Sequence, residues 1–192
     1  MGQMLHDRLD LLYPRIIDRD AFVYGNVKPD LMRKGAKDRH MLSDTAPFLN
    51  LTAKYLQQPS VEPEEDWVLL GMICHHVCDA FCRYHQQVEL YRDYGRHLEY
   101  ELGLNGFFNG WMQNGLSLNL EGRVIDGAHP DGFFIPEATE MDQESGVMRL
   151  LQPRLSLYQA GEPSFFLDLR YALETSSQVV DTILAGRFHG QG

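Results

Sequence analysis

The sequence predicts an all-α domain of about six or seven helices. Apolar residues recur at intervals of three and four in most segments, which is the period of an amphipathic helix. Glycine and proline gather in the stretches between those segments. In the middle of the chain, two histidines are each followed four residues later by a carboxylate, and on a helix such a pair shares one face.

The first third of the chain predicts two helices on either side of an irregular stretch. Leucines at spacings of four and three indicate a helix over Leu5–Leu12. Residues 21–42, AFVYGNVKPDLMRKGAKDRHML, contain two glycines, an asparagine and a proline, so we expect a loop or a broken helix there. Ser43 or Asp44 can cap a helix that continues to about Gln57.

The central helix is predicted to run from Pro63 to about Tyr84. Proline suits the first turn of a helix, and the three acidic residues that follow it lie where the helix dipole favours negative charge. A further helix is predicted from about Val88 to Leu104. Its apolar side consists of Tyr91, Tyr94, Leu98 and Leu102.

Residues 105–136 are the least regular part, with six glycines. Within them, residues 122–136, GRVIDGAHPDGFFIP, predict an extended loop that can contain a short hairpin. His129 and Asp131 lie there, either in a substrate pocket or in a surface turn. The C-terminal part, residues 139–188, returns to helix with a break at Pro153. After Gly161 and Pro163, a last helix with apolar residues at helical spacing is expected to pack on the core.

Composition narrows the class of protein. A chain of 192 residues with 44% hydrophobic and 23% charged residues suits a single globular domain over residues 1–192. The net charge of −10 disfavours an electrostatic grip on nucleic-acid backbone, double-stranded nucleic acid included, and on an anionic membrane. We expect no signal peptide and no transmembrane segment, and therefore a cytoplasmic protein with reduced thiols.

Three cysteines, Cys74, Cys78 and Cys82, lie four residues apart on one predicted helical stripe. They cannot form a long-range disulfide framework. Two interpretations remain: small side chains packed beside the histidine face, or thiolate metal ligands.

The candidate metal ligands begin with His75 and Asp79, which are four residues apart. His85 follows six residues later, and His97 and Glu101 form a second pair at a spacing of four. Imidazole and carboxylate are ligands that zinc favours. A single such pair is more often solvated surface, but two pairs that bracket a third histidine favour a metal site.

Earlier candidates are weaker by themselves. Asp30 and His40 stand in the irregular stretch, either as site residues carried by a loop or as surface residues. His6 lies beside the apolar stripe of the first helix. His76 is rotated by about 100° from His75 on an ideal helix, so we do not expect it to bind the same metals.

Together these residues resemble the zinc-dependent phospholipase C family, whose fold is shared by the single-strand-specific nucleases. The resemblance covers about the first 105 residues. It implies a multi-helix bundle with a metal cluster between helices, whose motifs lie in residues 1–105. It rests on four sequence segments, YGNVKPDL, KDRHM, LLGMICHHVCDAFCRYHQ and RHLEYE. It rests also on the order of the candidate ligands along the chain: Asp30, His40, His75, Asp79, His85, His97 and Glu101.

The resemblance implies two or three zinc ions. One zinc would be bound by Asp30, His40, His75 and Asp79, and a second by His85, His97 and Glu101. A third would be bridged by Asp79 and bound by His6 and by the N-terminal residue. In the family that residue is a tryptophan, whereas the two tryptophans here are Trp67 and Trp111, so this sequence departs from the pattern at that ligand.

Such a site suits phosphate-ester hydrolysis. Neighbouring divalent ions can clamp a phosphate and lower the pKa of bound water to about 7. Three carboxylates (Asp30, Asp79 and Glu101) against two or three zinc ions leave the cluster positive inside an acidic protein. Asp30 is the candidate catalytic residue, because it can orient or deprotonate the attacking water.

The preferred function is therefore a metal-dependent phosphodiesterase of phospholipase C type, acting on a small phosphate ester or a phospholipid headgroup. A nuclease or nucleotide phosphatase on the same scaffold is a second interpretation. A non-catalytic metal-binding helical protein is a third, because fold alone does not fix function.

Overall fold

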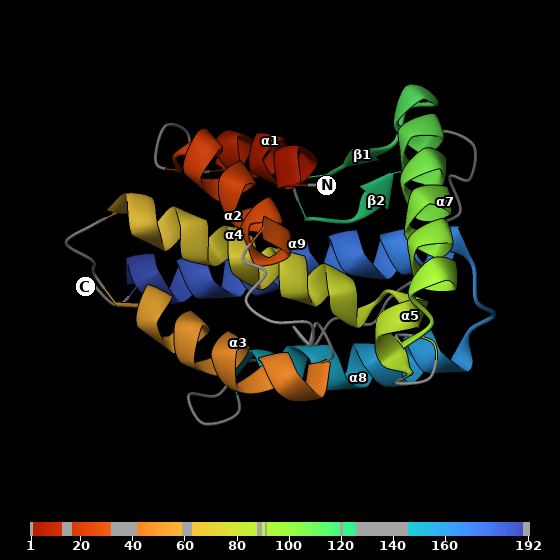
Figure 1. Ribbon diagram of the computed structural model, residues 1–192. Coiled ribbons are helices and arrows are strands. Elements are labelled where there is room, and N and C mark those ends of the chain that lie inside the picture. The colour runs from red at the N-terminus through yellow and green to blue at the C-terminus, as the bar shows by residue number, and fades with distance from the viewer. Residues whose placement is uncertain are drawn as a thin grey trace.

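The computed structural model describes residues 2–12, 17–31, 42–58, 63–87, 90, 92–119, 121–125 and 146–189. Across these ranges the protein has eight helices and one two-stranded sheet, which confirms the all-α prediction (Figure 1). The elements are α1 (Gly2–Leu12), α2 (Arg19–Leu31), α3 (Leu42–Leu56), α4 (Pro63–Ala80), α5 (Arg83–Gln86), α7 (Tyr94–Gln113), β1 (Ser117–Leu118), β2 (Val124–Ile125), α8 (Gly146–Ala160) and α9 (Phe165–His189).

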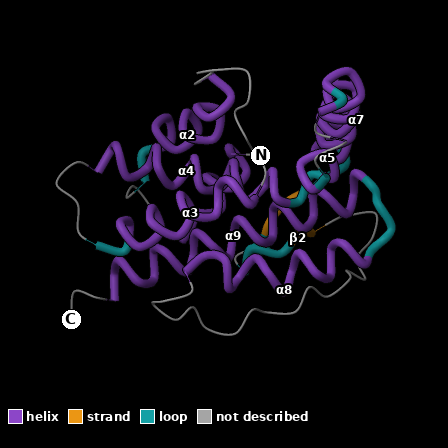
Figure 2. The backbone as a smooth tube through the Cα atoms, turned by 60° about the horizontal axis from the view of Figure 1, so that its bottom comes forward, coloured by secondary structure: helices purple, strands orange, loops and turns teal. Residues whose placement is uncertain are grey.

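The core lies around α4 and α9. In Figure 1, α1 and α2 lie on one side of this pair and α3 and α8 on the other, and Figure 2 shows α7 standing across one end. The buried side of α4 includes Leu70, Ile73 and Val77, and α9 buries most of its length. Removing this apolar surface from water is the main contribution to folding.

Two glycines let α2 and α4 cross with their backbones in contact. A Cβ atom on Gly71 would lie 2.2 Å from the Phe22 carbonyl oxygen and 2.9 Å from Gly25 Cα. A Cβ atom on Gly25 would lie 2.2 Å from the Val68 carbonyl oxygen. Only glycine fits at this crossing. The close contact there sets how closely the next turns of α2 and α4 approach each other.

The prediction of a loop or broken helix over residues 21–42 is wrong for its first half, because α2 is helical from Arg19 to Leu31. Gly25, which suggests a break in the sequence, is buried against α4 and helps to hold the helix in place. Pro29 stands two residues before the helix ends, so its missing N–H removes a single backbone hydrogen bond. Residues 32–41 lie outside the described ranges.

Two other helices are longer than predicted. α7 continues to Gln113 instead of ending near Leu104, and the buried Trp111 anchors its far end. Pro153 lies inside α8 instead of breaking it, with its ring exposed and the buried Arg154 and Leu155 beside it.

The predicted hairpin is present earlier than expected: Ser117 pairs with Ile125 in an antiparallel register. Arg8 of α1 fixes it, because its guanidinium donates to the Asn119 carbonyl at 3.2 Å and to Asp181 of α9 at 3.0 Å. His129 and Asp131, the candidates in the following loop, lie outside the described residues.

Candidate metal centre

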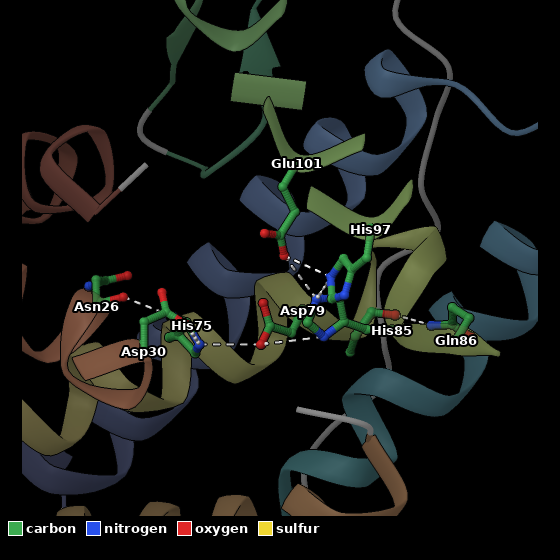
Figure 3. A network of polar contacts seen from close by, with 9 residues as sticks. Asn26, Asp30, His75, Asp79, His85, Gln86, His97 and Glu101 are labelled. Carbon is green, nitrogen blue, oxygen red and sulfur yellow. Dashed lines mark hydrogen bonds and ion pairs between the residues drawn. The ribbon is translucent and has the colours of Figure 1, made fainter. Parts of the chain in front are cut away.

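Asp79 lies between two histidines at the end of α4 (Figure 3). Its Oδ2 is 3.2 Å from His75 Nε2 and 3.8 Å from His85 Nδ1. Helical spacing places His75 one turn before Asp79 on the same face. The helix ends at Ala80 rather than near Tyr84 as predicted, and the turn that follows lets α5 bring His85 back beside Asp79.

The imidazole of His75 is held at both nitrogens. Its Nδ1 is 2.9 Å from the Asn26 carbonyl oxygen, to which it can donate, and its Nε2 faces Asp79 and lies 3.8 Å from Asp30 Oδ1. Burial lowers the pKa of His75, but the Asp79 hydrogen bond, the charges of Asp79 and Asp30 and the Asn26 carbonyl outweigh burial and raise it to about 9. This negative surrounding attracts any cation, a proton or a metal ion, to Nε2.

A second group gathers where α5 meets α7. Glu101 Oε1 is 2.8 Å from His97 Nε2 and 3.3 Å from His85 Nε2, and the two imidazole nitrogens are 3.0 Å apart. The hydrogen bonds from His85 and His97 outweigh burial and lower the pKa of Glu101 to about 2. Three ligand atoms from three side chains thus converge on one point.

The three histidines are largely covered, Asp79 is intermediate, and Glu101 and Asp30 open towards solvent. The side chains of His75, His85 and His97 are 10%, 5% and 12% exposed. Those of Asp79, Glu101 and Asp30 are 16%, 47% and 66% exposed. A ligand from solution can therefore reach the carboxylate side of the site.

A comparison with protein families decides the relationship. The family model for zinc dependent phospholipase C matches residues 1–127, a range that contains both groups. The chain belongs to the zinc-dependent phospholipase C family. The resemblance stated from the sequence is thereby confirmed. No curated protein and no solved structure matches the chain.

Zinc is the metal that the family implies, and the donor atoms fit it. Imidazole nitrogens and carboxylate oxygens at tetrahedral spacing are its usual protein ligands. Within each of two sets the ligand atoms lie within 4.8 Å of one another: His75, His76 and Asp79, and His85, His97 and Glu101. Family membership also indicates a hydrolase, and no helix in the described ranges has the length and apolar character needed to span a membrane.

The eight metal ligands predicted from the sequence fall into three classes by where the structure places them. Six of them come together around Asp79 in the arrangement of Figure 3. His40 lies outside the described ranges. His6 lies on α1 and is not a member of either set of ligand atoms. The six are Asp30, His75, Asp79, His85, His97 and Glu101.

His6 is buried, and neither ring nitrogen hydrogen-bonds to any described residue. Its Nδ1 lies 3.8 Å from Oδ1 of Asp7, too far for a hydrogen bond. A buried polar atom without a partner costs about 1–3 kcal/mol, so such an imidazole suits a ligand role. A Cβ atom on Gly2 would lie 2.9 Å from Asn26 Cγ, which places the start of α1 beside the residue that orients His75.

The cysteines do not join either group. Cys74 and Cys82 are buried, and Cys78 Sγ is 3.4 Å from the Ser176 hydroxyl. Burial raises the pKa of Cys74 well above its usual value and that of Cys78 to about 11. Protonated thiols in a packed stripe favour the packing interpretation over thiolate ligation.

His76 is a close neighbour whose role can be tested against that of His75. Its ligand atom lies within 4.8 Å of those of His75 and Asp79. Its ring, however, packs edge-on against Phe48 of α3 at 5.4 Å, whereas His75 faces both Asp30 and Asp79. We therefore expect His75→Ala to lose about one equivalent of zinc and His76→Ala to keep the wild-type content. Elemental analysis of the two purified variants checks this, and equal losses would contradict the assignment.

Proposed function

We propose that the protein is a zinc-dependent phosphodiesterase of phospholipase C type that hydrolyses small phosphate esters or phospholipid headgroups. The position of Asp79 carries the proposal. One of its oxygens faces a histidine from each group, at 3.2 Å and 3.8 Å. A carboxylate so placed can bridge two cations and hold them a few ångströms apart, as a two-metal clamp on a phosphate requires.

The roles follow from the contacts. His75, Asp79, Asp30 and His40 would hold one zinc, and His85, His97 and Glu101 a second. Zinc, when bound, supplies positive charge for the phosphate oxygens and lowers the pKa of water. Asp30 has the most exposed carboxylate of the three, so it can accept a proton from a water beside the phosphate. His6 would bind a third ion.

The surface beside the site favours a substrate with an apolar part. Three apolar side chains are exposed on α7: Tyr94 at 67%, Leu98 at 43% and Leu102 at 64%. Leu98 and Leu102 directly follow His97 and Glu101 in the chain, and Tyr94 lies three residues before His97. Of the four residues predicted to give this helix an apolar side, Tyr91 lies outside the described residues, and the other three share one side of α7 that is exposed and adjoins the site residues. The charge of −10 disfavours a nucleic-acid polymer.

Substrate class is tested by offering three substrates to the zinc-loaded protein. We expect turnover of a soluble phosphate bis-ester and of phosphatidylcholine vesicles, and turnover of single-stranded DNA at least about 100-fold slower, because the acidic surface repels the polymer. Faster cleavage of DNA would favour the nuclease interpretation. A protein that binds zinc and cleaves none of the three would be a non-catalytic metal-binding protein.

Metal content is the simplest prediction. Protein purified without chelators is expected to contain at least about two equivalents of zinc, one for each group of ligand atoms. Elemental analysis gives the number, and anomalous scattering at the zinc edge gives the ligands. A protein without transition metal, although folded, would exclude the proposed chemistry.

A further inference from the structure

Asp168 is a buried carboxylate that three other elements contact. It lies in the first turn of α9 and is 2% exposed. Tyr100 of α7 donates its hydroxyl to Oδ2 at 2.5 Å, and Tyr158 of α8 donates to Oδ1 at 2.8 Å. The backbone N–H of Arg83, the first residue of α5, also points at Oδ2, at 3.5 Å. One carboxylate thus joins four helices.

A carboxylate in this position is costly, so its presence needs a reason. Burial raises the pKa of Asp168, against the opposing effect of the hydrogen bonds from Tyr100, Tyr158 and Arg83. An apolar side chain would fill the same space without that desolvation cost. Asp168 instead offers acceptor atoms that fix the directions of three donors.

Two of those donors adjoin the second metal group. Tyr100 immediately precedes Glu101, and Arg83 stands two residues before His85. Between them, the ring of Tyr84 stacks on His97 at 5.7 Å with an interplanar angle of 15°, and lies 4.8 Å from the ring of Tyr100. Asp168 therefore bonds directly to residues that neighbour Glu101 and His85 in the chain, and it reaches His97 through the rings of Tyr100 and Tyr84.

Few buried side chains hold the metal-bearing end of α7. Trp111 is the only buried residue of the helix and lies about four turns beyond His97. Near the site, Phe165 packs on Tyr100 at 4.9 Å and fits against Gly103, which provides apolar contact without a fixed direction. The hydrogen bond from Tyr100 supplies the direction. Figure 1 shows α5 and α7 meeting the start of α9 at one end of the molecule.

We propose that Asp168 is a positioning residue for the metal group formed by His85, His97 and Glu101. It acts through the Tyr100 hydroxyl and the Arg83 N–H, which hold α7 and α5 at the separation that lets the three ligand atoms share one ion. The inference rests on the proposed function only in taking this group as a metal site. It assigns no such role toward the group of His75 and Asp79.

Tyr100 and Tyr158 form a matched pair for the test. Each donates one hydroxyl to the same carboxylate, but α7 carries metal residues and α8 carries none of the described candidates. Cobalt(II) replaces zinc as a coloured probe, and its two binding steps are followed by visible absorption and calorimetry. His97→Ala and His75→Ala identify which step belongs to which group.

Tyr100→Phe is expected to weaken cobalt binding at the second group by about 10–100-fold, as loss of a group that orients metal ligands does, and to alter its visible spectrum. Binding at the first group should change by less than about threefold. Tyr158→Phe should leave both steps within about threefold of wild type, although both variants lose a comparable hydrogen bond and comparable stability to urea.

The inference would be overturned if the two variants had equal effects on cobalt binding, or if Tyr100→Phe bound cobalt at the second group as the wild type does. Either result would leave the proposed function intact. A wild-type protein that binds no cobalt would overturn both. If Tyr100→Phe does not fold, Asp168→Asn, which keeps an acceptor oxygen in place, is measured in its stead. A loss confined to the second group is again the expected result, and an unchanged second group again overturns the inference.

Discussion

Asp79→Asn is expected to abolish phosphodiester cleavage and to lower zinc content. Asparagine keeps the shape of the side chain but removes the charge that faces His75 at 3.2 Å and His85 at 3.8 Å. A neutral amide cannot bridge two cations. Turnover should fall by at least about 100-fold, the scale seen when one preorganised electrostatic group is removed from an active site.

Folding should survive this substitution. Asp79 lies on the open side of α4, and the buried residues that pack the helix, such as Ile73 and Val77, are unchanged. Some loss of thermal stability is expected, because metal binding couples to folding. A chelator added to the wild-type protein should reproduce most of that loss, which separates the loss of metal from damage to the helix.

Asp93→Asn is the control for this prediction. Asp93 caps α7, where its Oδ1 accepts from the Arg96 N–H at 3.3 Å, and asparagine caps a helix about as well as aspartate. The same chemical change is thus made at an exposed acidic residue outside both groups. Bis-ester turnover and zinc content are measured for the two variants side by side. If they behave alike, the metal-centred interpretation of this chain is wrong.

Helical spacing accounts for what the sequence predicted at the site. His75 with Asp79, and His97 with Glu101, are brought together by a single turn of helix, so local spacing was sufficient. The all-α class followed from the same periodicity. Contacts between His85 and its partners depend on where α4 ends, and the sequence indicated this only to within a few residues.

Other parts of the site depend on contacts between distant residues, which spacing does not reveal. Gly25 suggested a break, although its lack of a side chain is what allows α2 to pack on α4. The Asn26 carbonyl that orients His75 is a backbone atom and leaves no mark in the sequence. Asp168 and Tyr100 are 68 residues apart, and an aspartate and a tyrosine in separate helices give no signal of their hydrogen bond.

The crossing of α2 and α4 leads to the second large prediction. Gly71→Ala places a methyl group 2.2 Å from the Phe22 carbonyl oxygen and 2.9 Å from both Asn26 N and Gly25 Cα. All of these are backbone atoms, so no side chain can move aside and the two helices must separate. Overpacking of this kind costs about 1–3 kcal/mol, occasionally more, and we expect the upper end of that range.

Separation of the helices should also reach the metal. Asp30 lies five residues after Gly25, and His75 lies four residues after Gly71. Both residues therefore belong to the helical turn that follows the crossing. The bond from His75 Nδ1 to the Asn26 carbonyl, at 2.9 Å, and the 3.8 Å approach of Asp30 to His75 Nε2 would both lengthen. Gly71→Ala should therefore weaken zinc binding at the first group by about 10-fold or more, as loss of a ligand-orienting contact does.

Gly106→Ala provides the matched control, because it makes the same change inside a helix where a Cβ atom meets nothing within 4 Å. Alanine there should stabilise the protein by up to about 1 kcal/mol, since glycine disfavours the helical state. Urea unfolding with a chelator present measures stability, and zinc titration of both variants measures the site. Of these two glycines, only Gly71 faces backbone atoms. If the Gly71→Ala protein is as stable as Gly106→Ala and binds zinc with wild-type affinity, the crossing does not set the distance between Asp30 and His75.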